Sequence, residues 1–188
     1  YCLVKLKKET KDYGLLVGKE LLEQTLERIN VKEFEILGTC KGIKLDRLDA
    51  KHPYLERPSK FVLGDHVTTE VGTGIVHTAP GHGLEDYIVA KEYDLEVISP
   101  VKNNGTFSSQ EEHVAGLFVF KANEKIIEVL EEEGTLLAKA DYEHSYPHCW
   151  RHKTPLMFRA TPQWFIGMDK SSLLVNANKA IKDVSWEP

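Results

Sequence analysis

Residues 72–87, with the sequence GTGIVHTAPGHGLEDY, place two histidines and an acidic pair among glycines. Glycine allows a backbone to approach a ligand or another segment closely. Asp86 falls in the first turn of an expected helix, where the helix dipole stabilises a carboxylate by about 0.3–1 kcal/mol and keeps it ionised. An ionised carboxylate can hold an ammonium group, and His77 can donate or accept a proton near pH 7. The stretch is therefore a candidate binding or catalytic site.

Three other interpretations of this stretch stay open. Glycines often form the turn before a helix, and Asp86 would then only cap that helix. A phosphate-binding loop would require GxxxxGK[ST] or GxGxxG at the start of a helix, but no lysine follows Gly83 and GTG runs into a strand-like segment. A metal could bind to His77, His82 and Asp86, although structural zinc sites usually pair two recognisable ligand dyads and only one loose group is present here.

A second group of reactive side chains follows at residues 143–153. Its metal-binding side chain types are His144, His148, Cys149 and His152. Its aromatic and basic side chains, which could stack on bases and pair with phosphates, are Trp150, Arg151 and Lys153, followed by Arg159 and Trp164. The same residues also suit an ordinary pair of strands whose cations extend along an apolar surface into water.

Short strands and a few helices are expected to position these residues. The spacing of apolar residues predicts a helix over 18–30, and further helices are predicted over 84–93, 121–133 and 171–183. Strands are predicted over 1–8, 13–17, 34–45 (bent or bulged at Gly38 and Gly42), 61–67, 72–79, 95–101, 136–150, 154–161 and 163–168, with a loop over 51–60. Many short, bent strands with a few covering helices predict a strand-rich α+β fold centred on a β-barrel.

Composition limits the classes of protein. The 188 residues are 41% apolar and 28% charged, which is ordinary for a soluble globular domain with one core. No apolar run approaches the roughly 20 residues that cross a bilayer, and the charged N-terminus is not a signal peptide. Cys2, Cys40 and Cys149 form no CxxC motif, which favours free thiols in the cytoplasm. The net charge of −5 argues against a dedicated nucleic-acid clamp but not against a local basic surface.

The motifs resemble those of one family. GTGIVHTAPGHGLEDY is similar to the signature of the editing domain of isoleucyl-tRNA synthetases, an insertion within their catalytic domain. HSYPHCWRHKTPLMFRATPQWF, residues 144–165, resembles the segment that leads back to the catalytic domain, and ILGTCKG, LGDHVT and SPVKNNGTF are also similar to family stretches. The GHG form and the ATPQWF ending resemble the bacterial type. The resemblance implies one editing domain over 1–188, and because Tyr1 is not an initiator methionine we expect a longer polypeptide.

The resemblance implies post-transfer editing, which is hydrolysis of the ester that joins valine to isoleucine tRNA. An apolar pocket distinguishes one methylene by only about 10–200-fold, isoleucine and valine being the standard example, so a second hydrolytic site is needed. Asp86 matches the aspartate that binds the α-ammonium group, and His77 matches the histidine that limits the pocket against isoleucine. The further substrate contacts expected are Thr73, Gly74, Gly81, His82 and Gly83. Trp150, Arg151 and Lys153 are expected to contact tRNA.

No serine or cysteine nucleophile is evident, so a positioned water, assisted by a sugar hydroxyl, is expected to attack the ester. The resemblance implies no cofactor or metal for editing, and ATP with Mg at the synthetic site of the whole enzyme. The implied partners are valine-bearing isoleucine tRNA and the catalytic domain of the same polypeptide. In the family an upstream threonine-rich segment also contacts the substrate, and Thr68 and Thr69 are not its equivalent. A non-catalytic RNA-docking module and a metal-dependent hydrolase are the competing hypotheses.

Overall fold

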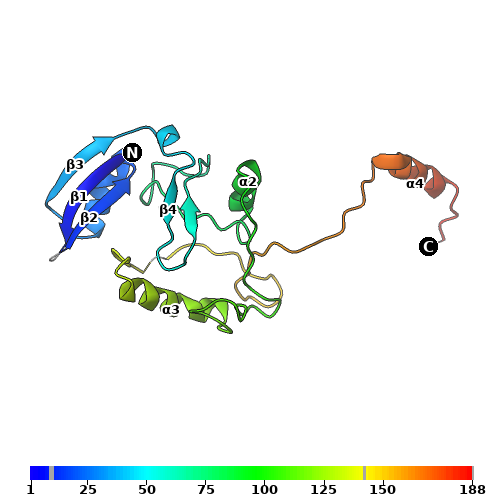
Figure 1. The fold of residues 1–188 in the computed structure, drawn as a ribbon. Helices are drawn as coiled ribbons and strands as arrows, with labels where there is room; N and C mark the ends of the chain where they lie inside the picture. The colour runs from blue at the N-terminus through cyan, green and yellow to red at the C-terminus, as the bar shows by residue number, and fades with distance from the viewer. Residues whose placement is uncertain (9–10, 142, 188) are drawn as a thin grey trace.

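The computed structural model describes residues 1–8, 11–141 and 143–187 (Figure 1). Its strands are β1 Cys2–Lys8, β2 Lys11–Val17, β3 Phe34–Thr39, β4 Asp49–Lys51 and β5 Pro58–Lys60. Its α-helices are α1 Leu22–Arg28, α2 Leu84–Glu92, α3 Val119–Glu132 and α4 Leu173–Lys182, with 3-10 turns η1 Lys19–Leu21, η2 Gly42–Lys44 and η3 Lys170–Ser172. Strands and helices are not alternated in βαβ units, which confirms the predicted α+β class.

The N-terminal core forms because β1 alternates. Cys2, Val4 and Leu6 are at most 1% exposed, whereas Leu3 between them is 43% exposed. The strand is central in an antiparallel sheet of order β2-β1-β3, and its buried face packs on η1 and α1. The other core members are Val17, Leu21, Leu22, Leu26, Ile29 and Val31. The predicted strands at 1–8 and 13–17 and the helix at 18–30 are therefore confirmed.

A β-bulge bends β3 where the sequence predicted an irregularity. Leu3 pairs with Gly38 and the next residue, Val4, pairs with Ile36, so Leu37 is the extra residue of the bulge. Gly42 then begins η2, and a Cβ there would lie 3.1 Å from the Tyr1 ring. The expected strand over 34–45 thus ends at Thr39.

The described residues form no closed barrel. The second sheet contains only the antiparallel pair β4–β5, and the predicted strands at 61–67 and 72–79 form no ladder. In the second of these segments Gly72 and Gly74 have φ of +78° and +73°, which interrupts extended backbone. The predicted strands at 95–101, 136–150, 154–161 and 163–168 were also wrong, because within the described residues they contain at most isolated bridges.

The predicted loop at 51–60 was wrong at both ends. Residues 49–51 and 58–60 pair as a short hairpin, with Lys51 opposite Pro58. Pro58 is tolerated because it is the first residue of β5, a position at which a missing N–H costs little.

The remaining predicted helices are confirmed at α2, α3 and α4. Gly134, with φ of +65°, follows the end of α3 as the sequence indicated. Figure 1 shows α4 at the end of an extended segment, away from the rest of the chain. None of the described helices combines the length and the apolar character that crossing a membrane would require.

Candidate functional site

The GTG turn is held against the N-terminal sheet by its own backbone. The Gly18 N–H donates to the Thr73 carbonyl oxygen at 2.7 Å, and the Tyr1 hydroxyl donates to the Gly74 carbonyl oxygen at 2.7 Å. Gly74 is buried, and a Cβ on it would lie 3.4 Å from the Gly18 Cα. The close approach that these glycines permit is thus to another segment of the same chain.

A cavity of about 760 Å³ opens next to this turn. Its wall combines the β4–β5 hairpin, residues 61–67, residues 74–78 and the α2 side chain of Val89. Polar side chains in the wall include Asp46, Arg57, Ser59, His66, His77 and Thr78. Ligand pockets usually enclose about 300–1,000 Å³, so a small ester or nucleoside would fit in this volume.

His77 lies in the cavity wall, and its ring faces a buried histidine. The His77 side chain is exposed, whereas His52 is only 4% exposed. The two ring centroids are 6.4 Å apart with the planes at 85°, and the Tyr54 ring lies 4.7 Å from His52 at 84°. Burial lowers the pKa of His52, and the charges of Arg57 and His77 lower it further. His52 and Tyr54 could not be identified from the sequence, because a histidine before Pro53 indicated only a loop.

Asp86 lies in the first turn of α2 without a partner. Its carboxylate folds back over Gly83, and a Cβ on Gly83 would collide with Asp86 Oδ2. The Asp86 side chain forms no cap and no hydrogen bond or ion pair with the described residues. Gly83 is therefore the residue that leaves room for the carboxylate, and the carboxylate is free to bind a cation.

Gly81 and His82 join the motif to residues 158–160. The Ala160 N–H donates to the Gly81 carbonyl oxygen at 2.7 Å, and His82 Nδ1 lies 2.9 Å from the Phe158 carbonyl oxygen. A carbonyl oxygen only accepts, so the proton is on Nδ1. A Cβ on Gly81 would collide with the Ile98 carbonyl oxygen. In this structure both residues connect two segments of the chain.

The predicted site residues fall into two groups. Gly74 and His77 line the cavity, whereas Thr73, Gly81, His82, Gly83 and Asp86 are outside its lining. Asp86 and the lining residue Val89 are three positions apart, so they are neighbours on one face of α2. The carboxylate is accordingly about one helical turn from the cavity wall.

The residues predicted to contact tRNA lie in a separate turn. The bridge between His148 and Pro155 closes this turn, and Lys153 has a φ of +57°. Trp150 is 76% exposed, and the Arg151 guanidinium lies 4.9 Å from the centroid of the Trp150 ring. An outward aromatic face and a cation are thus present together, as stacking on a base would require.

The histidines of this turn do not assemble a metal site. His148 Nδ1 lies 2.7 Å from the Tyr146 carbonyl oxygen, and the His152 N–H donates to Cys149 Sγ at 3.5 Å. Across residues 1–8, 11–141 and 143–187, no three His, Cys, Asp or Glu side chains are grouped so that they could hold a metal ion.

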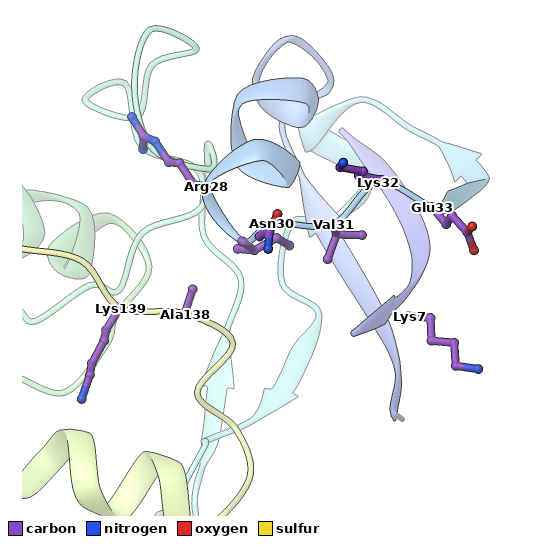
Figure 2. Close-up of a pocket in the computed structure, with 9 residues that line it drawn as sticks. Lys7, Arg28, Asn30, Val31, Lys32, Glu33, Ala138 and Lys139 are labelled. Carbon is purple, nitrogen blue, oxygen red and sulfur yellow. The ribbon is translucent and has the colours of Figure 1, made fainter. Parts of the chain in front are cut away.

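A second cavity, of about 890 Å³, lies between the end of α1 and residues 138–139 (Figure 2). Its charged lining residues are Lys7, Arg28, Lys32, Glu33 and Lys139. Figure 2 shows the charged ends of Lys7, Arg28 and Lys139 pointing away from one another. Lys139 Nζ also pairs with Glu131 at 3.2 Å. The cations therefore do not converge on one anion.

Comparison with known proteins relates the chain to a class of enzyme. No protein-family model matches the chain. It is 51% identical over 180 residues to the isoleucine–tRNA ligase of Aliivibrio fischeri (strain MJ11), 52% over 176 residues to that of Photobacterium profundum, and 48% over 188 residues to that of Shewanella sp. (strain W3-18-1). These alignments cover 96%, 94% and 100% of this chain but 19%, 18% and 20% of the ligases.

The chain spans about a fifth of the length of the curated relatives that it matches. Identity of about half over nearly all its residues makes it homologous to a segment of the aminoacyl-tRNA synthetases. Within that class, its homologues are the isoleucine–tRNA ligases.

Proposed function

We propose that the chain is the editing domain of an isoleucine–tRNA ligase and hydrolyses valine from mischarged isoleucine tRNA. The observation that carries the proposal is a helix-start carboxylate without a partner, one helical turn from a cavity whose wall contains His77. The homology to one segment of isoleucine–tRNA ligases supports the choice of amino acid and tRNA.

Asp86 is proposed to bind the α-ammonium group of the ester. A hydrogen bond to a charged group contributes about 1.5–3 kcal/mol. The Asp86 carboxylate forms no hydrogen bond with the described residues, so it is available for the ammonium group. His77 is proposed to limit the size of the side chain that the cavity accepts. A small pocket rejects a larger side chain by steric clash, whereas a large pocket cannot strongly reject a smaller side chain.

Water is the proposed nucleophile. Ser59 and Thr78 are hydroxyl residues in the cavity wall, and within the described residues neither forms a hydrogen bond with a histidine. Without an adjacent base a hydroxyl is a weak nucleophile. A bound water near the ester, assisted by the neighbouring sugar hydroxyl, needs only positioning by the cavity.

We also propose the partners of the chain and the cofactors of the whole ligase. The partners are isoleucine tRNA and the catalytic domain of the same polypeptide in the cytoplasm. ATP and Mg would act at the synthetic site of that ligase, outside this chain. The barrel expected of such a domain would grow from the outer edges of β2 and β3, which end the three-stranded sheet and leave backbone groups open to further strands.

The experiment compares Asp86→Asn with Glu85→Gln in a complete isoleucine–tRNA ligase containing this chain. Both changes remove one carboxylate from the first turn of α2, but Glu85 is exposed and only the Asp86 carboxylate folds back over Gly83. Asp86→Asn should slow release of valine from isoleucine tRNA by about 10–100-fold, and Glu85→Gln should not. Isoleucine activation should be unchanged in both. Full deacylation by Asp86→Asn would remove Asp86 from the site.

A second candidate function is RNA docking at residues 148–155. The exposed Trp150 with Arg151 stacked on its ring is the observation that favours it. Trp150→Ala should then weaken tRNA binding by about 5–150-fold, because base–aromatic stacking contributes about 1–3 kcal/mol. An unchanged dissociation constant in a filter-binding titration would exclude this contact.

A further inference from the structure

His52 is a buried histidine that belongs to none of the predicted sites. It is 4% exposed and directly follows β4, at the start of the turn that leads to β5. Its Nδ1 accepts hydrogen bonds from the N–H groups of Tyr54 at 3.3 Å and Leu55 at 3.0 Å. The backbone N–H of His52 donates to the Arg57 carbonyl oxygen at 3.2 Å. The ring is therefore fixed in its position by the backbone of its own turn.

This fixed ring lies behind the cavity wall. His77 lines the cavity and His52 does not, yet the two rings are 6.4 Å apart in an edge-to-face arrangement. His77 is exposed and forms no hydrogen bond with the described residues that would hold its ring. Edge-to-face pairs at this separation are favourable beyond the area that they bury. The contact with His52 can therefore restrict the orientation of the His77 ring.

We propose that His52 is a positioning residue that fixes the His77 ring at the cavity wall and so sets the size limit of the site. The inference rests on the proposed editing function, in which His77 limits the amino-acid side chain. It assigns to the β4–β5 turn a part in discrimination between valine and isoleucine. His52 itself touches neither the cavity nor a substrate in it.

The neighbours of His52 keep it in the form that this role needs. Both backbone N–H donors require a lone pair on Nδ1, so the neutral ring with its proton on Nε2 is the one that fits. The titratable and charged groups around it are Arg57, His77 and Tyr54, and Tyr54 in turn contacts the His113 ring at 5.7 Å. A positive charge on the His52 ring, next to Arg57 and His77, would be unfavourable.

Two substitutions test the ring and the hydrogen-bond acceptor of His52 separately. His52→Asn keeps an acceptor oxygen near the place of Nδ1 and removes the ring. His52→Phe keeps a ring and removes the acceptor. The variants are made in a complete isoleucine–tRNA ligase containing this chain, and hydrogen exchange at the Tyr54 and Leu55 amides reports whether the turn is intact. The activity readout is the ratio of kcat/KM for hydrolysis of valyl and isoleucyl esters of isoleucine tRNA.

The expected result is that His52→Asn lowers this ratio about three- to tenfold with the turn amides still protected, and that His52→Phe keeps the ratio with faster exchange. In a His77→Ala background, His52→Asn should have no further effect, because it acts through His77. Equal loss of both activities in His52→Asn, or an added effect in that background, would overturn the inference.

A readout that needs no activity is the His77 ring itself. A crystal structure of the His52→Asn ligase should show that ring displaced or in several rotamers, and the His52→Phe ligase should show it in place. An unmoved His77 ring in His52→Asn would contradict the positioning role. A wild-type ligase that releases no valine from isoleucine tRNA would instead contradict the proposed function, and the ring position would still decide the role of His52.

Discussion

The two ends of the described chain differ in the burial of their apolar side chains. In residues 1–31 the side chains of β1, β2 and α1 bury one another, and Val4 and Val17 are 0% exposed. In residues 161–187 the large apolar side chains face solvent: Trp164 101%, Phe165 87%, Ile166 77%, Val175 67% and Trp186 74%. Large exposed apolar surface of this kind marks a place where another surface binds.

The difference shows which part of the chain forms a hydrophobic core from its own residues. The N-terminal unit has strands β1 and β2 and a covering helix, and its buried core residues all lie within residues 2–31. Outside this unit α3 buries Ala122 and Val129, but α4 has no buried residue. The apolar face of α4 stabilises the fold only if it packs on a further surface, and the catalytic domain of the same polypeptide is the partner proposed above.

The largest expected contrast is in hydrogen exchange. Amides of β1 should exchange only on global unfolding, which in small domains costs about 5–15 kcal/mol, whereas amides of residues 161–168 should exchange at nearly unprotected rates. Mass-spectrometric exchange on this 188-residue chain measures both regions in one experiment. Strong protection of 161–168 would show that these residues pack in solution, and the comparison would fail.

A core truncation should have a large effect in the first region and almost none in the second. Leu6 is 1% exposed, so Leu6→Ala should lower the free energy of unfolding by about 2–5 kcal/mol. Val175→Ala in α4 should change it by less than about 0.5 kcal/mol, because that side chain is 67% exposed. Urea unfolding followed by circular dichroism measures both variants. Equal losses would mean that α4 is part of the core.

How far the sequence predicts this molecule depends on the range of the interactions involved. Alternation in 1–8 and helical spacing in 18–30 predicted the elements that form there, because each pattern is local. The strands expected at 61–67 and 72–79 did not form, since a strand needs a partner and Gly72 and Gly74 bend the chain away from one.

The same distinction between local patterns and long-range contacts applies to the site. The position of Asp86 in the first turn of a helix follows from local sequence and is confirmed. The contact between His52 and His77 joins residues 25 positions apart, and no pattern in either segment indicates it. The bonds from Gly81 and His82 to residues 158–160 are likewise set by tertiary packing, so the sequence alone could predict the residue types but not their neighbours.

The GTG turn offers a matched pair at the boundary of the packed region. Gly72→Ala and Gly74→Ala both place a side chain at positive φ, which costs about 1–2 kcal/mol. A Cβ on Gly72 meets open space, whereas one on Gly74 meets the Gly18 backbone at 3.4 Å. Gly74→Ala should therefore lower the free energy of unfolding more than Gly72→Ala in the same urea titration. Equal losses would show that the contact with Gly18 does not restrict position 74.

The smallest effect expected concerns pH and the His52 turn. Burial lowers the pKa of His52 from its ordinary value of 6.5, with Arg57 and His77 adding to the shift. Between that lowered pKa and 6.5 the unfolded chain binds a proton at His52 that the folded chain does not. The contribution of His52 is therefore complete above pH 6.5 and decreases as the pH falls below it.

Stability measured from pH 8 to pH 5 by urea unfolding should accordingly decline less steeply below pH 6.5 in His52→Asn than in the wild type. His152→Asn is the matched control, because it removes an exposed histidine from the turn at residues 148–155. That control should keep the wild-type slope. If His52→Asn and His152→Asn have the same slope, then His52 titrates as an exposed histidine does and its ring is not held neutral by the fold.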